Sequence, residues 1–203
     1  RWEKFKTLKR GYYSLIILLI TYGISFFLPL LINNRALIVK YNGDYYFPAF
    51  SGYVSGKTFN QDVPGEARYR KLKIEFRENN NGDWVLLPPY PYSPFEDITF
   101  EGNKMYQPPS SLHWMGTDNT GRDVFARLCY AFNISISFAL LLTIINYIIG
   151  ILIGGAMGYF GGKFDLIFQR LVEIWSNLPM LFVIIILSSI IKPSFYLLIG
   201  IYT

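Results

Sequence analysis

The sequence has few of the residues from which disulfides and metal centres are built. Its 203 residues include one cysteine, Cys129, and one histidine, His113. A single cysteine excludes an intrachain disulfide, and together the two residues are too few for a protein-only His/Cys metal centre. We therefore expect no metal ion and no cofactor on this chain.

Charge is scarce as well. Charged residues make up 16% of the chain, against roughly 25% in soluble proteins, while 52% of the residues are hydrophobic and 18% aromatic. The net charge of +5 is concentrated in residues 1–11, whereas residues 33–112 carry as many acidic as basic side chains. A basic cluster beside a hydrophobic run is typical of a membrane flank. We expect the lipid bilayer as a partner and no nucleic acid.

The first hydrophobic run predicts a transmembrane helix near the N-terminus. Residues 11–34 contain no charged side chain, which is long enough to span a bilayer. The apolar part exceeds the usual core of a signal peptide and no A-x-A-like cleavage site follows it. We expect residues 1–11 in the cytoplasm, by the positive-inside rule, and the first transmembrane helix at 12–32.

The C-terminal part predicts further spans. Residues 128–162 form a second uncharged run, in which we place a span at about 134–158. A third is expected at about 167–191, and the last eleven residues look like the beginning of a fourth. Residues 133–203 would thus be the start of a transmembrane domain in a multi-pass, all-α membrane protein.

Three features of this part are candidate contact sites. Three glycines at four-residue intervals on one helix face favour close helix packing. A glycine-rich turn between the second and third spans would face the cytoplasm, and an Arg–Glu pair three residues apart can form an ion pair within the next helix. The residues are Gly150, Gly154 and Gly158; Gly161, Gly162, Lys163 and Asp165; and Arg170 with Glu173.

Residues 33–112 predict a small β-rich insertion outside the cytoplasm. Asn42-Gly43 between two β-prone runs is a strong hairpin signal. The stretch 68–77 alternates apolar and charged residues, which indicates a half-buried strand. We expect further short strands in 84–94 and 98–106. The aromatic side chains of this lobe either form a small core, dock a partner, or bind a peptide or sugar.

The stretch "SLHWMGTDNTGRDVFARL", residues 111–128, is either a catalytic cluster or a structural element. Read as a helix from Asp118, it pairs Asp118 with Arg122 and Asp123 with Arg127 at the favourable i,i+4 spacing. Val124, Phe125, Leu128 and Phe132 would then share one apolar stripe. No second histidine, serine nucleophile motif or metal-ligand spacing accompanies His113. We therefore expect an amphipathic elbow helix at 113–132 and no catalytic residues.

The same residues resemble a known family. "MGTDNTGRDVFARL" is similar to the G-T-D-x-x-G-R-D-x-x-x-R signature of dipeptide/oligopeptide ABC-importer permeases of the DppC/OppC type. The similarity continues through "YAFNISISFALLLT" and "GYFGGKFDLIFQRLVEIWSNLPMLFVIIILSS". "YNGDYYFPAF" and "PPYPYSP" look most like the microcin C-type permease subunit, which carries a large periplasmic insertion. The matched signature residues are Gly116, Thr117, Asp118, Gly121, Arg122, Asp123 and Arg127.

The resemblance implies a transport function on the N-terminal portion of an ABC importer type I permease fold. Such a subunit moves peptides or peptide-like compounds across the bacterial inner membrane. Its partners would be a second permease subunit, two ATPase subunits that carry ATP and magnesium, and a periplasmic peptide-binding protein. The signature residues would be scaffold, and the chain itself would not be an enzyme.

Three expectations qualify this interpretation. The sequence ends before the EAA-type coupling loop of the family, so we expect either a fragment or a truncated, non-functional copy. An alternative is a membrane-anchored sensor or binding protein that uses the 33–112 lobe, although no cytoplasmic signalling domain is visible. A third hypothesis, a membrane enzyme that uses His113 with Asp118 or Asp123, lacks a nucleophile–base pair.

Overall fold

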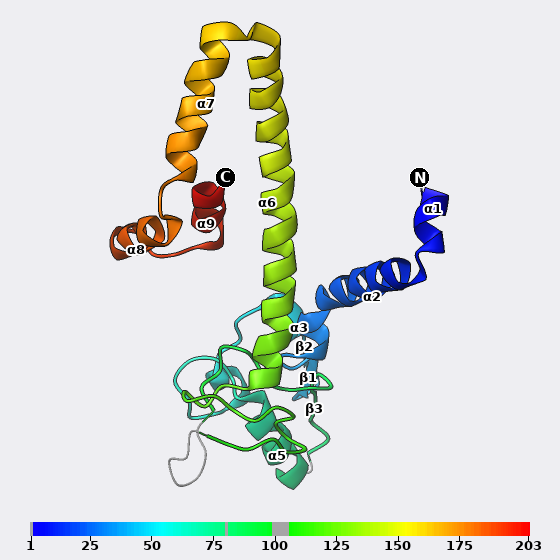
Figure 1. Cartoon of the computed structure of the whole chain (residues 1–203). Helices are drawn as coiled ribbons and strands as arrows, with labels where there is room; N and C mark the ends of the chain where they lie inside the picture. Colours follow the sequence, from blue (N-terminus) through cyan, green and yellow to red (C-terminus); the bar gives the residue numbers. More distant parts are fainter. Residues whose placement is uncertain (1, 80, 99–105) are drawn as a thin grey trace. The chain divides into compact units, whose positions relative to one another are not determined.

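The computed structural model describes residues 2–79, 81–98 and 106–203, and it divides into two compact units at residue 133. The first unit holds the N-terminal helices, a small lobe and the first turns of the long helix α6 (Val124–Phe160). The second unit holds the rest of α6 and three shorter helices (Figure 1).

The predicted first span consists of several helical pieces. α1 (Trp2–Thr7) precedes α2 (Lys9–Ser25), and the four-residue helix α3 (Leu28–Leu31) follows. Pro29 explains the break after Ser25, because proline has no N–H to donate to the carbonyl of Ser25 and its ring clashes with that carbonyl. The expected continuous helix over 12–32 is therefore interrupted at Phe26 and Phe27.

The lobe contains a three-stranded antiparallel sheet in the order β2-β1-β3. Its strands are β1 (Ile38–Tyr41), β2 (Asp44–Tyr46) and β3 (Trp84–Leu86). The hairpin predicted at Asn42-Gly43 is confirmed, since the φ angles of 51° and 92° are those that a tight two-residue turn requires. The helix α4 (Pro48–Ser51) and the 3-10 helix η1 (Gly56–Phe59) follow β2.

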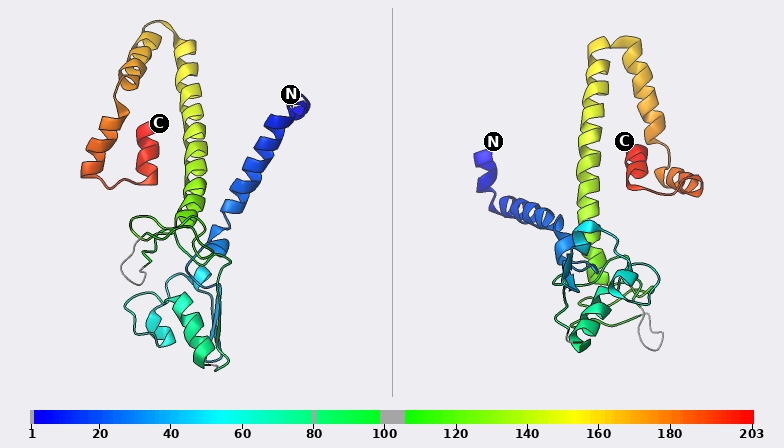
Figure 2. Two further views of the ribbon diagram at one scale, coloured as in Figure 1. Left: turned by 60° about the horizontal axis from the view of Figure 1, so that its bottom comes forward. Right: turned by 180° about the vertical axis from the view of Figure 1, so that it is seen from behind.

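The strand predicted for residues 68–77 is wrong, because α5 (Tyr69–Asn79) occupies this stretch. Tyr69, Leu72 and Phe76 are all buried, and their spacing of three and four residues is that of one helix face. Ile74, which the alternation placed on the same side as Leu72, is 59% exposed. α5 lies beside the sheet (Figure 1 and Figure 2), and its buried face packs in one core with Val39 and Val85. The strand predicted at 98–106 lies largely outside the described residues.

A second core cluster surrounds the first turn of α6. It consists of Leu28, Ile32, Tyr90, Tyr92 and Ala126. These residues bring together α3, the proline-rich segment after β3 and the N-terminus of α6. Backbone hydrogen bonds reinforce the cluster, since the Tyr90 N–H donates to Leu31 and the Asn33 N–H donates to Tyr90.

In the second unit, α7 (Gly162–Ser176), α8 (Met180–Ile190) and α9 (Phe195–Tyr202) follow α6. The turn expected at Gly161 and Gly162 is confirmed, with φ angles of 57° and 56°. The third predicted span is bent by 73° between α7 and α8. Pro179 accounts for the bend in the same way that Pro29 does, because it cannot donate to the carbonyl of Trp175.

Within the described part of the chain, α6 is the one helix long and apolar enough to cross a membrane alone, and the bent pair α7–α8 passes the same test together. The most apolar stretch of α6 has a mean hydropathy of 2.5, and no part of it is buried. Such uncovered apolar surface is costly in water and suits lipid or neighbouring helices. The positions of the spans and the orientation of the N-terminus remain predictions.

Candidate functional site

The family signature forms a closed loop followed by a helix. Thr117 pairs with Asp123 in an antiparallel bridge, and the Asp118 N–H donates to the Arg122 carbonyl at 2.9 Å. The predicted helix from Asp118 is therefore wrong in its start, because α6 begins at Val124. The Asp118 carboxylate explains the difference: its Oδ1 accepts from the N–H groups of Thr120 and Arg122, and such local bonds compete with helix formation.

Two signature glycines occupy positions where a side chain does not fit. Gly116 has φ 71°, and a Cβ there would lie 2.4 Å from the Gln107 carbonyl oxygen. Gly121 has φ 79°, and its Cβ would lie 2.7 Å from the Ile98 carbonyl oxygen. Both the positive φ and the close backbone approach favour glycine. The loop is thus held against the segments on either side of residues 99–105.

The ion pairs of the loop differ from those predicted. Arg122 Nε lies 2.7 Å from Asp97 Oδ1, and Arg127 pairs with Asp118. The expected Asp118–Arg122 and Asp123–Arg127 side-chain pairs are therefore wrong, since helical spacing does not apply before Val124. Asp123 makes a different set of contacts altogether.

The Asp118 carboxylate accepts several hydrogen bonds from within the loop. Partial burial favours a raised pKa for its carboxyl group, but the Arg122 N–H, the hydroxyl and N–H of Thr120 and the charge of Arg127 outweigh this and hold the pKa at about 2. Asp118 is therefore ionised at neutral pH, and the loop conformation depends on that charge.

Asp123 is the centre of the junction. Its side chain is fully buried. The Tyr90 hydroxyl donates to Oδ2 at 2.6 Å, and His113 Nδ1 lies 2.8 Å from the same oxygen. Oδ1 accepts from the Ala126 N–H at 2.8 Å, three residues along, which is the N-cap arrangement for α6. One carboxylate therefore caps α6 and ties it to two distant segments.

Aromatic rings enclose this carboxylate. The His113 ring lies 4.4 Å from that of Tyr92, and Trp114 contacts both Tyr90 and Phe125 at 5.0 and 4.8 Å between ring centroids. Burial, and then the hydrogen bond to Asp123, raise the pKa of the Tyr90 hydroxyl, which stays a neutral donor. The enclosure removes water from the junction and strengthens its hydrogen bonds.

The arrangement is suited to holding elements together and poorly suited to catalysis. His113 is 5% exposed and Asp123 not at all, so a substrate cannot reach the pair in this conformation. Among the described residues, no three His, Cys, Asp or Glu side chains are grouped to hold a metal ion. The sequence alone did not indicate Tyr90, Tyr92 or Asp97, because they contact His113, Arg122 or Asp123 across 21 to 33 positions.

The other predicted site residues lie in the second unit. Arg170 and Glu173 form the expected ion pair on α7. Lys163 and Asp165 lie in the first turn of that helix. A Cβ on Gly150, Gly154 or Gly158 would meet no atom within 4 Å, so their role in helix packing stays a prediction.

The chain is similar to permease proteins of known transport systems. The chain is 42% identical over 202 residues to the inner membrane ABC transporter permease protein YejE of Escherichia coli, and 33% identical to the peptidoglycan transport system permease protein YejE of Agrobacterium fabrum. Each alignment covers 99% of the chain and 58% of the relative.

A shorter similarity connects the chain to a dipeptide transporter. It is 42% identical over 87 residues to the dipeptide transport system permease protein DppC of Bacillus subtilis, which covers 43% of the chain and 27% of that relative. No family model and no solved structure matches the sequence. The homologues are thus peptide ABC transporter permeases, and the chain spans somewhat more than half the length of the first two.

Proposed function

We propose that this chain is part of the transmembrane permease subunit of an ABC importer that carries peptides or peptide-like compounds across the bacterial inner membrane. The observation that carries the proposal is the alignment of 99% of the chain with the permease of Escherichia coli at 42% identity. An apolar helix of 37 residues with no buried part in its most apolar stretch supports it.

The junction at Asp123 has a mechanical role in this proposal. An importer must move its membrane helices in response to nucleotide on partner subunits, and a helix transmits movement only if its ends are firmly connected. Asp123 caps α6 and bonds to Tyr90 and His113, so the start of α6 moves together with the second core cluster.

The assembly follows from the function proposed. Its partners are a second permease subunit, two ATPase subunits that bind ATP and magnesium, and a periplasmic binding protein that delivers the substrate. The subunit crosses the membrane several times with its basic N-terminus in the cytoplasm. The "YNGDYYFPAF" and "PPYPYSP" stretches support a microcin C-type subclass, and the relative named for peptidoglycan transport makes peptidoglycan peptides the competing substrate class.

The proposal is tested by peptide uptake. A bacterial strain that lacks the gene is complemented with its complete coding region, and accumulation of a radiolabelled tripeptide is followed with and without depletion of cellular ATP. We expect uptake that requires both the gene and ATP. Binding of the tripeptide to the purified chain without any gene-dependent uptake would instead favour the sensor or binding-protein alternative. Competition by a peptide–nucleotide conjugate, but not by a peptidoglycan peptide, would support the microcin C-type subclass.

A further inference from the structure

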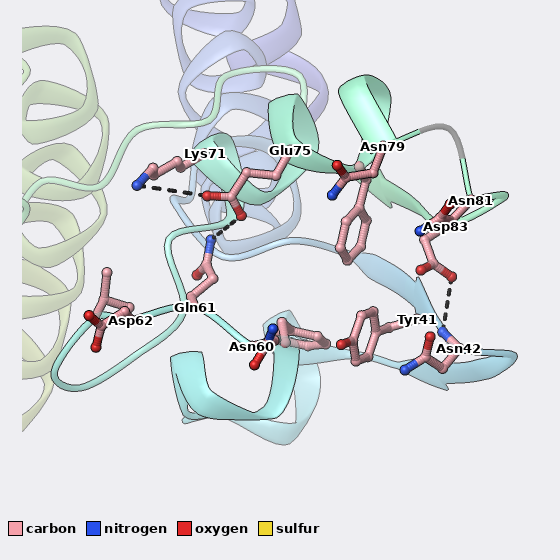
Figure 3. Close-up of a pocket in the computed structure, with 13 residues that line it drawn as sticks. Tyr41, Asn42, Asn60, Gln61, Asp62, Lys71, Glu75, Asn79, Asn81 and Asp83 are labelled. Atoms are coloured by element: carbon pink, nitrogen blue, oxygen red, sulfur yellow. Dashed lines mark hydrogen bonds and ion pairs between the residues drawn. The ribbon is translucent and has the colours of Figure 1, made fainter.

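A pocket in the lobe, separate from the Asp123 junction, has the composition of a ligand site. Its volume is about 410 Å³, within the range typical of small-molecule sites. Figure 3 shows Lys71, Glu75 and Asn79 of α5 on one side, facing Asn42 and Asn60 on the other. The pocket therefore lies between one helix and two turns.

The floor of the pocket is aromatic. Tyr41 stacks on Phe76 with the ring centroids 5.6 Å apart and the planes 3° from parallel, and Phe59 meets Tyr41 edge-on at 5.7 Å. Phe59 and Phe76 are buried, at 3% and 8% exposure, so these rings belong to the lobe core. The floor is closely packed and offers an apolar surface to a ligand side chain.

The rim of the pocket carries four asparagines: Asn42, Asn60, Asn79 and Asn81. Within the described ranges, none of the four side-chain amides makes a hydrogen bond, whereas the buried Gln61 nearby bonds through both amide atoms to Arg68 and Glu75. Each free amide has two donor hydrogens and one acceptor oxygen. The four asparagines are exposed to solvent, and a ligand that presents both N–H and C=O groups can replace the water on their amides.

Two of these asparagines hold positive φ angles. Asn42 has φ 51° and Asn60 φ 57°, and they are the only described residues other than glycine with positive φ. Asparagine tolerates this conformation better than most residues. Both turns thus direct an amide-bearing residue to the same pocket.

The charge of the pocket is negative. Asp62, Glu75 and Asp83 line it with one cation, Lys71, which lies 3.7 Å from Glu75. Asp83 accepts the Asn42 N–H through Oδ1 at 2.9 Å, and Asp62 makes no hydrogen bond or ion pair within the described residues. Asp62 and Asp83 lie at opposite ends of the pocket (Figure 3), so each carboxylate can receive a positively charged group on its own, and a ligand of negative charge is disfavoured.

From these observations we propose that the pocket binds the amino-terminal end of a short peptide. The Asp62 carboxylate receives the ammonium group, the asparagine amides bond to the peptide backbone, and an apolar side chain packs on the Tyr41–Phe76 floor. The choice of a peptide rests on the proposed transport function. The site is a contact for the transported compound on the lobe, outside the membrane-spanning helices.

The test is calorimetric titration of the whole chain in lipid nanodiscs with the tripeptide Ala-Ala-Phe. An N-acetylated copy of the tripeptide and N,N′-diacetylchitobiose serve as comparison ligands. Asp62→Asn removes one charge from an exposed side chain, and Asn60→Gly removes the amide while glycine keeps the positive φ without strain. Asp44→Asn, an exposed aspartate outside the pocket, is the matched control.

We expect Asp62→Asn, and acetylation of the ligand, to weaken binding by about tenfold or more, since each removes a charge-assisted hydrogen bond. Asn60→Gly removes a neutral hydrogen bond and should weaken binding by about two- to tenfold. Asp44→Asn should bind as the unmodified chain does. Equal affinity for the acetylated peptide, tighter binding of the disaccharide, or full affinity in both pocket variants would overturn the proposal. Peptide uptake distinguishes failure of this site from failure of the proposed function. Normal uptake together with full peptide affinity in both pocket variants would refute this site alone. Peptide binding at the pocket without uptake would refute the proposed function.

Discussion

Replacement of Asp123 by alanine should destabilise the first unit far more than replacement of any exposed aspartate near it. The carboxylate is fully buried and receives the Tyr90 hydroxyl, His113 Nδ1 and the Ala126 N–H. Alanine removes all three contacts at once and fills none of the space. The fold of the unit depends on these contacts, because they join segments that are distant in sequence.

The magnitude can be worked from the individual contacts. Loss of an N-cap costs about 1 kcal/mol. A buried donor that loses its acceptor costs roughly 1–3 kcal/mol, and Tyr90 and His113 each lose the carboxylate. We expect Asp123→Ala to lower the free energy of unfolding by about 3–7 kcal/mol. Asp123→Asn should cost less, because its side-chain oxygen can still cap α6.

The assay is urea unfolding in detergent micelles, followed by tryptophan fluorescence. With a denaturant slope of about 1–3 kcal/mol per molar urea, a loss of 3 kcal/mol moves the midpoint by at least about 1 M. Asp97→Ala is the matched control, since it removes only the partner of Arg122 in a pair whose Asp97 side chain is 66% exposed, and such pairs contribute up to about 1 kcal/mol. If Asp123→Ala were no more destabilising than Asp97→Ala, the junction would not hold the unit together.

Two further predictions concern charge and topology. The pKa of Asp118 is held at about 2, below its ordinary value, so its contribution to stability is complete above about pH 4 and is lost as the pH falls toward 2. The urea midpoint should therefore fall between pH 6 and pH 3 by more in the unmodified chain than in Asp118→Asn. An equal fall in both would show that the ionised Asp118 carboxylate does not stabilise the loop. For topology, a single cysteine at Asn42 in a Cys129→Ser background should react with a membrane-impermeant thiol reagent on intact spheroplasts, whereas one at Lys163 should react only after lysis. Reaction of the Lys163 cysteine in intact spheroplasts would reverse the orientation.

The sequence predicted well those features that depend on neighbouring residues. The hairpin at Asn42-Gly43 and the Arg170–Glu173 pair are confirmed, since each depends on positions at most three apart. The strand at 68–77 failed because Leu72 and Phe76 satisfy a helical period of four as well as an alternation of two. Pattern alone could not decide between the two periods.

The junction could be predicted only in part. The sequence indicates Asp123 as a signature residue, for which the resemblance implies a scaffold role, but it does not indicate Tyr90, and the predicted ion-pair partners are wrong. Helical spacing predicted a pair between Asp118 and Arg122, whereas in the loop Arg122 bonds to Asp97, 25 positions away. Asp123 accepts a hydrogen bond from Tyr90, which lies 33 positions away in the sequence. Contacts of this kind arise from the folded arrangement of the lobe, which local pattern does not encode.

Import is tested most directly by ATP-dependent accumulation of a labelled tripeptide in proteoliposomes. These would contain the complete gene product with its partner permease and ATPases, and the binding protein would be added outside. We expect accumulation that needs ATP on the ATPase side and falls sharply in Asp123→Ala, with Asp97→Ala close to the unmodified complex. Accumulation that is independent of ATP, or peptide binding with no accumulation at all, would contradict the proposed function.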